Sequence, residues 1–226
     1  MVNEQVWKEI ADELSEKSII LVAVSKTKPV SDIQELYDLG QHDFGENYVQ
    51  ELTEEQSQLP ADIRWHYIGH LQSNKVKYIA PFVHLIHAVD SFKLVQEINK
   101  QAAKHNRVID VLLQLHIAEE ETKFGLDEKE LFELLEYYDA QKADLQNVRI
   151  CGLMGMATNT EDERQVRSEY KRLRNVFVHL KDAQFLNVPH FNTCSIGMSS
   201  DYNIAIEEGS TMVRIGSLLF GARQYN

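Results

Sequence analysis

Short apolar runs alternate with amphipathic stretches along the whole chain. The runs are rich in Val, Ile and Leu, as expected for strands that are buried on both faces, and the stretches between them carry apolar residues at helical spacing. The pattern predicts strands at residues 19–24, 43–45, 64–68, 83–89, 108–117, 148–154, 192–195 and 212–215. It predicts helices at residues 2–15, 31–40 (with Ser31 as the cap), 46–58, 71–80, 91–105, 127–141, 160–181 and 200–208.

Eight strand–helix alternations without a linker or a low-complexity segment predict one closed parallel barrel, a (β/α)₈ or TIM barrel. Its length of 226 residues is within the range of a single barrel, so we expect residues 1–226 to form one domain. The alternative is an open doubly wound sheet. Such a sheet usually has a glycine-rich loop after its first strand, and this chain has SKTKP there, at residues 25–29.

The charge of the chain limits what it can bind. The 23 basic and 35 acidic side chains give a formal net charge of −12. This balance argues against a nucleic-acid surface, which needs a dense basic patch. An anionic cofactor then requires a pocket that is locally positive.

The sequence contains no typical membrane-spanning or targeting segment and no closely spaced cysteine pair, and these features bear on the cellular compartment. No apolar run approaches the roughly 18–20 residues that span a bilayer. The amino-terminal segment is acidic and amphipathic, so it is typical of neither a signal peptide nor a transit peptide. Cys151 and Cys194 lie far apart and form no CxxC pair, which indicates reduced thiols. We therefore expect a cytoplasmic protein with no membrane contact.

Lys26 directly follows the first apolar run. In a barrel, the carboxyl ends of the strands form the face that carries the active site. Partial burial at such a strand end favours the neutral form of a lysine amine, which can attack a carbonyl. The alternative is a lysine that only begins a solvated loop. Lys28, two residues further on, either repels the charge of Lys26 or lies in solvent.

Arg214 lies inside the apolar strand at residues 212–215. A buried cation needs a partner or a ligand, because burying an unpaired charge is costly; a structural ion pair is the alternative to a ligand. Gly216 and Ser217 follow at once and open a helix, and the sequence SIGMS (195–199) ends the seventh strand. Small residues at the ends of strands seven and eight, beside a helix N-terminus, form the phosphate site common in barrels.

These features together predict the class of ligand. An amine able to form an imine, a phosphate cradle and an arginine between them match an aldehyde that carries a phosphate. Pyridoxal 5′-phosphate (PLP) is the obvious candidate.

Six stretches of the sequence match the motifs of one family in order and at compatible spacing. They are 22–29 (VAVSKTKP), 44–51 (FGENYVQE), 65–75 (WHYIGHLQSNK), 152–157 (GLMGMA), 195–201 (SIGMSSD) and 209–221 (GSTMVRIGSLLFG). With them the chain resembles the pyridoxal phosphate homeostasis protein family (YggS in bacteria, PROSC in animals) over nearly its whole length. The departures are Ile196, where the family has Met, and Ser200, where it is often acidic.

The resemblance implies a barrel like the N-terminal domain of alanine racemase, and a role for several residues. Lys26 would carry PLP as a Schiff base, Asn47 would line the ring pocket, and Met154 would pack against the ring. Arg214 would face the pyridine nitrogen. A guanidinium stays protonated and gives that nitrogen no proton, so the ring would be a weaker electron sink than one paired with Asp.

The resemblance also assigns the phosphate end of the pocket. Ser195, Gly197, Gly216 and Ser217 would surround the phosphate. Lys123, which follows the fifth strand, matches a family lysine with a role in cofactor exchange.

His66 and His70 are four residues apart but flank a strand end and Gly69, so they do not form a metal-binding pair on a helix. No acidic residue has matching ligand spacing, and we expect no metal site. His66 instead is expected to shape the wall of the pocket.

Three functions remain open. The first is a PLP carrier without catalytic residues of its own, which passes PLP to apo-enzymes and acts as a monomer. The second is a PLP-dependent racemase or decarboxylase of the alanine racemase type. Those enzymes have a second β domain after the barrel, and this chain reaches Asn226 soon after the eighth strand; we therefore favour the carrier. The third is a Schiff-base aldolase for a sugar phosphate, which gives Arg214 no ring to face.

Overall fold

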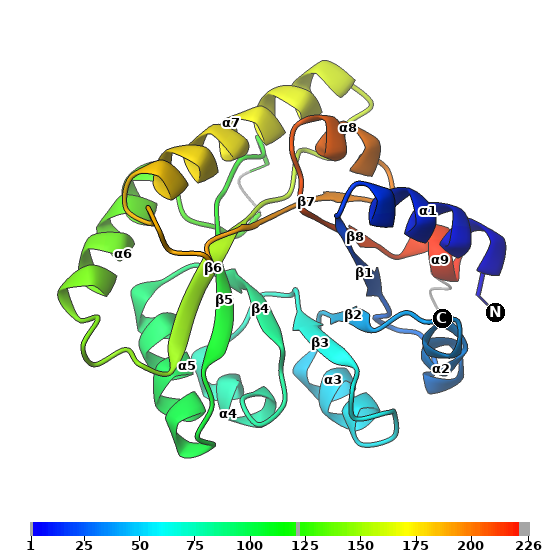
Figure 1. The fold of residues 1–226 in the computed structure, drawn as a ribbon, viewed down its shortest axis with the longest axis horizontal. Coiled ribbons are helices and arrows are strands. Elements are labelled where there is room, and N and C mark those ends of the chain that lie inside the picture. Colours follow the sequence, from blue (N-terminus) through cyan, green and yellow to red (C-terminus); the bar gives the residue numbers. More distant parts are fainter. Residues whose placement is uncertain (1, 121–122, 222–226) are drawn as a thin grey trace.

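Eight parallel strands close into a barrel. The computed structural model describes residues 2–120 and 123–221. Its strands are hydrogen-bonded in the order β1-β2-β3-β4-β5-β6-β7-β8, and β8 pairs with β1. The helices surround the strands (Figure 1). The predicted (β/α)₈ barrel is therefore confirmed, and the pairing of β1 with β8 excludes the open sheet.

The elements follow the alternation expected from the sequence. The strands are β1 Ile20–Val24, β2 Asp43–Glu46, β3 Arg64–Tyr67, β4 Leu85–Val89, β5 Ile109–Gln114, β6 Val148–Met154, β7 Thr193–Met198 and β8 Met212–Ile215. The helices are α1 Glu4–Glu16, α2 Val30–Asp38, α3 Val49–Gln56, the 3₁₀ turn η1 Ser73–Lys75, α4 Val76–Ile79, α5 Phe92–Lys104, α6 Glu128–Ala140, α7 Glu163–Asp182, α8 Tyr202–Glu207 and α9 Ser217–Phe220.

Three helix starts differ from the predictions. The helix expected at 46–58 begins only at α3, because Glu46 pairs with Tyr67 as the last residue of β2. The helix expected at 71–80 is η1 followed by α4, because the backbone of Gln72 is still extended. Ser31 does not cap α2: Pro29 occupies the N-cap position, with no side-chain hydrogen bond.

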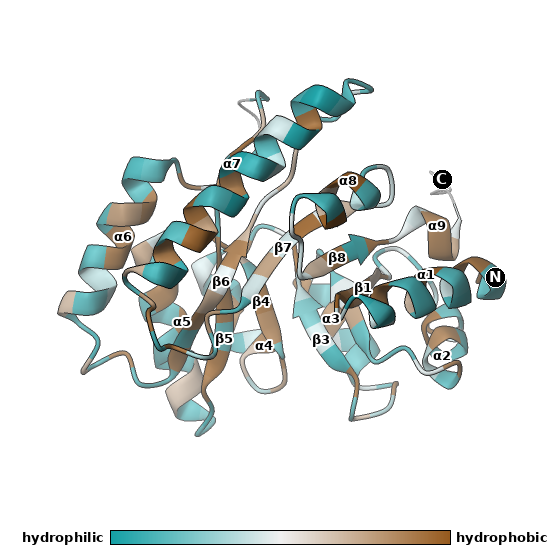
Figure 2. Ribbon diagram, turned by 45° about the horizontal axis from the view of Figure 1, so that its top comes forward, coloured by the Kyte–Doolittle hydropathy of each residue, from teal (hydrophilic) through white to brown (hydrophobic). Residues whose placement is uncertain are grey.

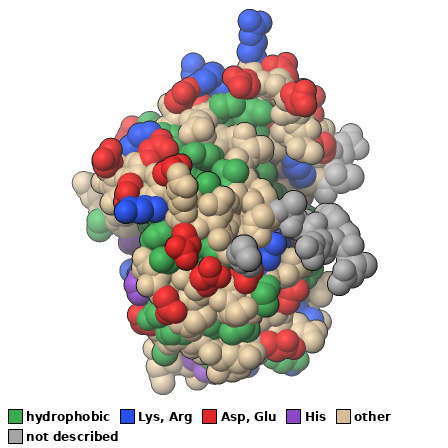
Figure 3. All heavy atoms as spheres, turned by 90° about the vertical axis from the view of Figure 1, so that its right-hand side faces the viewer, with side chains coloured by type: hydrophobic (Ala, Val, Ile, Leu, Met, Phe, Trp, Pro, Cys, Tyr) green, Lys and Arg blue, Asp and Glu red, His purple; other side chains and the backbone are tan. Residues whose placement is uncertain are grey.

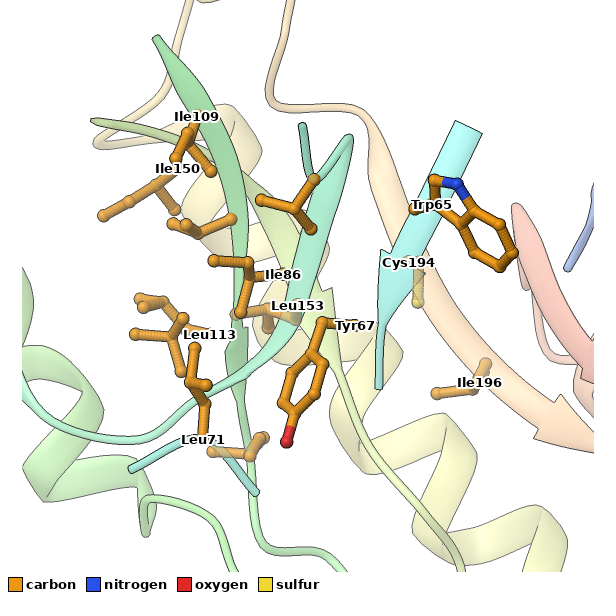
Figure 4. Packing of buried hydrophobic residues seen from close by; sticks show 14 of the residues in the cluster. Trp65, Tyr67, Leu71, Ile86, Ile109, Leu113, Ile150, Leu153, Cys194 and Ile196 are labelled. Carbon is orange, nitrogen blue, oxygen red and sulfur yellow. The ribbon is translucent and has the colours of Figure 1, made fainter. Parts of the chain in front are cut away.

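The core has an outer layer and an inner layer. Because successive strand residues point to opposite faces, Trp65 and Tyr67 on β3 pack outward in the apolar layer between strands and helices, as do Cys194 and Ile196 on β7 (Figure 4). The helices contribute their apolar sides to this layer and expose polar ones (Figure 2).

The inner layer mixes apolar and polar side chains. A smaller apolar cluster fills part of the barrel interior: Val22, Leu85, Ala88, Leu112, Cys151, Met154 and Met212. By the same alternation, His66, Ser195 and Arg214 point inward, because their neighbours on both sides belong to the outer layer. All three are buried. The barrel interior therefore holds a polar system as well as an apolar one.

The surface and the thiols agree with the composition. On the face shown in Figure 3, acidic and basic side chains are interspersed and no basic patch gathers. Cys151 and Cys194 are free and buried, and burial raises the pKa of Cys151 to about 12 and that of Cys194 to about 11. No helix of the described residues has the length and apolar character needed to cross a membrane.

Gly197 lies where β7 meets α8. Its φ of +99° is in the left-handed region, and a Cβ there would lie 2.6 Å from the Cβ of Ala205. Gly40, after α2, has a similar φ of +108° but nothing within 4 Å of an added Cβ. Alanine substitutions at the two positions can therefore be compared: both introduce backbone strain, and only the one at Gly197 also introduces a steric overlap.

We predict that Gly197→Ala lowers the free energy of unfolding by roughly 2–4 kcal/mol, because overpacking adds to the strain of a positive φ. Gly40→Ala should cost only about 1 kcal/mol, from the positive φ alone. Urea denaturation followed by circular dichroism measures both. Equal losses in the two variants would contradict the packing assigned to Gly197.

Candidate functional site

A pocket of about 300 Å³ opens at the carboxyl ends of the strands. Its walls come from β1, β7 and β8 and from the segments that follow β1, β2, β3, β6, β7 and β8. The lining residues are Val24, Lys26, Lys28, Asn47, Ile68, Met156, Met198, Ser199, Ser200, Arg214, Gly216, Ser217 and Gly221. This is the face of a barrel on which ligand sites are built.

The charged residues of the lining, as far as the structure describes it, are all cations. Lys26, Lys28 and Arg214 contribute to it, and no described Asp or Glu does. The whole chain has a net charge of −12, so this pocket is a local exception. A concave site with three cations and several hydroxyl groups favours an anionic ligand.

Pairing of the first and last strands brings Lys26 to this pocket. Ala23 on β1 is in register with Ile215 on β8, so the segments that follow the two strands leave the barrel side by side. Lys26 is half-buried there, and Gly216 donates its N–H to the hydroxyl of Ser199 at 3.1 Å. The lysine and the small residues after β7 and β8 therefore meet in one pocket.

Arg214 is a buried cation held by oxygen acceptors. Its side chain is on the pocket wall, yet the residue is only 4% exposed. Nη1 donates to the carbonyl of Ser195 at 2.8 Å and to its Oγ at 2.6 Å, and Nη2 donates to the carbonyl of Gly155 at 3.0 Å. Burial lowers the pKa of Arg214, but a guanidinium remains charged at neutral pH. None of the described carboxylates forms an ion pair with it.

Five of the residues expected around the cofactor line the pocket: Lys26, Asn47, Arg214, Gly216 and Ser217. The binding roles given to them remain predictions. Asn47 adds an observation of its own, because its Oδ1 is buried and has no hydrogen-bond partner among the described residues. A buried acceptor without a partner is costly, so Asn47 presents an acceptor that a donor in the pocket can satisfy.

Four other expected residues do not line this pocket. Met154 is fully buried in the inner apolar cluster, and Ser195 is fully buried behind Arg214. Gly197 packs β7 against α8. His66 lies inside the barrel, where its ring nitrogens meet Asp43 and His87.

Met156, Met198, Ser199 and Ser200 line the pocket and were not assigned from the sequence. All four lie in the motifs GLMGMA and SIGMSSD. Met156 is two residues past Met154, so a period of two continued beyond the end of β6 would have pointed to it.

Lys123 lies outside the pocket lining. Its Nζ donates to the carbonyl of Ala157 at 2.5 Å and pairs with Glu120 at 3.0 Å. It therefore joins the segment after β5 to the segment after β6, and its part in cofactor exchange remains a prediction.

A carboxyl cluster fixes the two residues on either side of Lys26. Ser25 donates its hydroxyl to Glu46 at 2.5 Å, and the backbone N–H of Thr27 donates to Glu51 at 3.1 Å. Thr27 has a φ of +65°, which is rare for a β-branched residue. The acidic side chains thus hold a strained segment in place.

Glu46 and Glu55 face each other inside this cluster. One carboxylate oxygen from each of Glu46, Glu51 and Glu55 lies within 4.8 Å of the others, and the Oε2 atoms of Glu46 and Glu55 are buried without a partner. Burial raises the pKa of both Glu46 and Glu55, and the neighbouring carboxylates raise them further. The raised pKa of Glu46, about 9, favours its protonated form at neutral pH.

Asp43, His66 and His84 also bring three ligand atoms within 4.8 Å of one another. Arg64 occupies both oxygens of Asp43, with Nε at 2.8 Å from Oδ1 and Nη2 at 2.5 Å from Oδ2. The guanidinium of Arg64 already neutralises the carboxylate of Asp43, so the charge of Asp43 does not require a metal ion for its compensation.

A family model and curated relatives match this chain over nearly its whole length. A family model described as alanine racemase, N-terminal domain, matches residues 4–224. A pyridoxal phosphate homeostasis protein of Aquifex aeolicus is 43% identical over 206 residues, which cover 91% of this chain and 87% of that protein.

Two solved structures of PipY from Synechococcus elongatus share this fold at 32% identity. The one without PLP has a TM-score of 0.85 and covers 96% of this chain and 99% of its own. The one with PLP bound has a TM-score of 0.80 and covers 96% and 100%.

We predict that Glu46→Gln stabilises the protein at alkaline pH. Because the folded-state pKa of Glu46 is raised, the folded protein holds more protons than the unfolded chain above the ordinary glutamate range, and stability falls as pH rises toward the raised pKa. Gln keeps the acceptor for Ser25 and offers Glu55 a donor without charge. At pH 8 the variant should gain more than about 1.4 kcal/mol, the equivalent of one pKa unit.

At pH 5 the variant and the wild type should differ little, because Glu46 is then protonated in the folded wild type. Urea denaturation at several pH values measures the free energy of unfolding as a function of pH. Glu54→Gln, an exposed change on α3 next to Glu55, is the control and should leave the pH dependence of stability nearly unaltered. A lower stability gain for Glu46→Gln at pH 8 than at pH 5 would contradict the raised pKa assigned to Glu46.

Proposed function

The chain belongs to the pyridoxal phosphate homeostasis protein family, and from that premise we propose that it binds PLP on Lys26 and serves PLP homeostasis without catalytic turnover. The observation that carries the proposal is the pocket itself. It places a lysine, an arginine and several hydroxyl groups around a cavity whose described lining residues include no Asp or Glu. When bound, PLP supplies an aldehyde that condenses with the lysine amine, with loss of water, to a Schiff base.

The residues present fit this cofactor. A volume of about 300 Å³ is at the lower end of small-ligand pockets. The unpartnered Oδ1 of Asn47 accepts a hydrogen bond from a ligand donor. Met156 and Met198 supply apolar walls for a ring, and the lining cations balance a phosphate.

Each end of the pocket has its own task. Lys26 holds the aldehyde carbon, and its segment is fixed by the bonds of Ser25 and Thr27 to the carboxyl cluster. Ser199, Gly216 and Ser217 lie together after β7 and β8, where barrels commonly hold a phosphate. Arg214 contributes a permanent charge toward the ring and gives it no proton.

A PLP-dependent racemase or decarboxylase is the alternative function. Racemisation needs acid–base groups on two faces of the substrate. The described lining contains no His, Cys, Tyr, Asp or Glu, and its titratable side chains are Lys26, Lys28 and Arg214. Lys28 donates to the carbonyl of Phe220 at 3.0 Å, a structural contact at the rim. These contacts support binding rather than turnover.

The setting of this function is part of the proposal. We place the protein in the cytoplasm as a monomer that passes PLP to apo-enzymes. Two buried, free thiols support a reducing compartment. An aldolase acting on a sugar phosphate is less well supported, because it leaves Arg214 without a ring to face.

We predict that PLP becomes attached to Lys26 and to no other lysine. The purified protein with PLP should absorb near the visible edge, and borohydride should fix the cofactor to a peptide containing residue 26. Lys26→Ala should lose both signals. Lys28→Ala, two residues away on the same segment, is the matched control and should retain the attachment. The reverse pattern would move the attachment site to Lys28.

We further predict no turnover with common amino acids. The loaded protein should show no racemase, decarboxylase or transaminase activity near the about 1–10³ s⁻¹ typical of enzymes. Chiral chromatography and product assays on protein with a full complement of PLP measure this. Turnover within that range, lost in Lys26→Ala, would replace the carrier with an enzyme.

A further inference from the structure

A chain of hydrogen bonds crosses the barrel interior from one face to the other. It begins at Asp43, at the amino end of β2, where Arg64 donates to both carboxylate oxygens. His66 Nε2 lies 2.9 Å from Asp43 Oδ1, and His66 Nδ1 lies 2.9 Å from His87 Nε2.

The chain ends at the pocket. His87 Nδ1 lies 3.2 Å from Ser195 Oγ, which accepts from Arg214 Nη1 at 2.6 Å. His66, His87, Ser195 and Arg214 are each no more than 4% exposed. We call Asp43, His66, His87 and Ser195 the relay.

The two ends set the direction of the bonds between them. An arginine can only donate and an ionised carboxylate can only accept. Burial raises the pKa of Asp43, but the hydrogen bonds from Arg64 and His66 outweigh it and hold that pKa well below its ordinary value. His66 Nε2 must therefore carry a proton, and Ser195 Oγ receives one from Arg214.

With a neutral His87, the bonds in the middle then have two consistent arrangements. In the first, Ser195 donates to His87, His87 donates to His66, and both histidines are neutral with the proton on Nε2. In the second, His66 is a cation and every middle bond is reversed. The second arrangement leaves the Ser195 hydroxyl hydrogen without an acceptor among the described contacts and adds a buried cation between Arg64 and Arg214.

The surroundings also favour the neutral arrangement. Burial lowers the pKa of His87 well below its ordinary value, and the charge of Arg214 lowers it further. Tyr170 and Asp201 interact electrostatically with Arg214, but neither forms a hydrogen bond with it in the described structure. The carboxylate joined to Arg214 by continuous hydrogen bonds is therefore Asp43, on the opposite face of the barrel.

We propose that the relay positions Arg214 in the pocket wall, with its bonds running from Arg214 through Ser195, His87 and His66 to Asp43. His66 and His87 are thus positioning residues, which touch no ligand and act through the guanidinium. The effect on PLP rests on the proposed function, whereas the direction of the bonds does not.

Nitrogen NMR of the ligand-free protein tests the direction of the relay. With ¹⁵N-labelled histidine, His66 and His87 should both be neutral at pH 7 with protonated Nε2 and bare Nδ1. This measurement needs no variant of the relay, so it does not depend on a mutant that folds. A doubly protonated His66, or a proton on Nδ1 of His87, overturns the proposed direction.

Substitutions at His87 test the positioning role, because His87 does not line the pocket. His87→Phe keeps bulk but cuts the relay, and PLP should dissociate about tenfold more readily, the usual order for a weakened hydrogen bond to a charged group. His87→Gln can accept with its oxygen and donate with its nitrogen, so it should restore binding to within about threefold of the wild type.

His84→Gln is the matched control. Its ring lies 5.4 Å from that of His66, but no side-chain hydrogen bond of His84 is present in the described structure, and PLP binding should be unchanged. Fluorescence titration with PLP measures each affinity. Equal affinity in His87→Phe and His84→Gln overturns the positioning role.

The experiments can contradict the proposed relay and the proposed function independently of each other. If borohydride fixes no PLP to Lys26 in the wild type, the proposed function is wrong, and the NMR result still decides the direction of the relay. If PLP is fixed to Lys26 but His87→Phe binds it normally, PLP binding stands and the positioning role is wrong.

Discussion

The pairing of β1 with β8 is the constraint on which the site depends. It sets Val22 opposite Arg214 and Ala23 opposite Ile215, although these residues are far apart along the chain. Because the strands are parallel, Lys26 and Ser217 leave the barrel at the same edge and meet in one pocket. In an open sheet, the first and last strands would be able to lie at different edges, and the lysine and the arginine would have no common cavity.

The strands were predictable because most are buried on both faces and read as short apolar runs. β6 and β8 have the predicted bounds, and Lys26 and Arg214 were placed at the pocket because each is a cation in or beside an apolar strand. The start of α3 was not predictable in the same way. Glu46 looks like the first residue of a helix, and only its pairing with β3 and its partner Glu55 explain a buried carboxyl group in a strand.

Which polar side chains lie inside the barrel could not be predicted from the sequence, for a different reason. Which side chains point into a barrel depends on strand register, and the register shifts within β4, β5 and β7. A shift of one residue exchanges the inward and outward sets. His66 and Met154 do point into the barrel, but they lie inside it behind the pocket: His66 is in the relay, and Met156, two residues past Met154, lines the pocket.

The positive pocket depends on where the protein keeps its negative charge. Arg214 is joined to Asp43, but through three intervening side chains, so that carboxylate lies at the other face of the barrel. The acidic groups behind Lys26 include the buried Glu46, whose raised pKa favours its neutral form and so lowers the negative charge on that side of the pocket. Coulomb energy falls with distance, so neither group cancels the cations at the lining. An acidic protein thereby retains a site for an anion, because Asp43 lies at a distance and the raised pKa of Glu46 favours its neutral form.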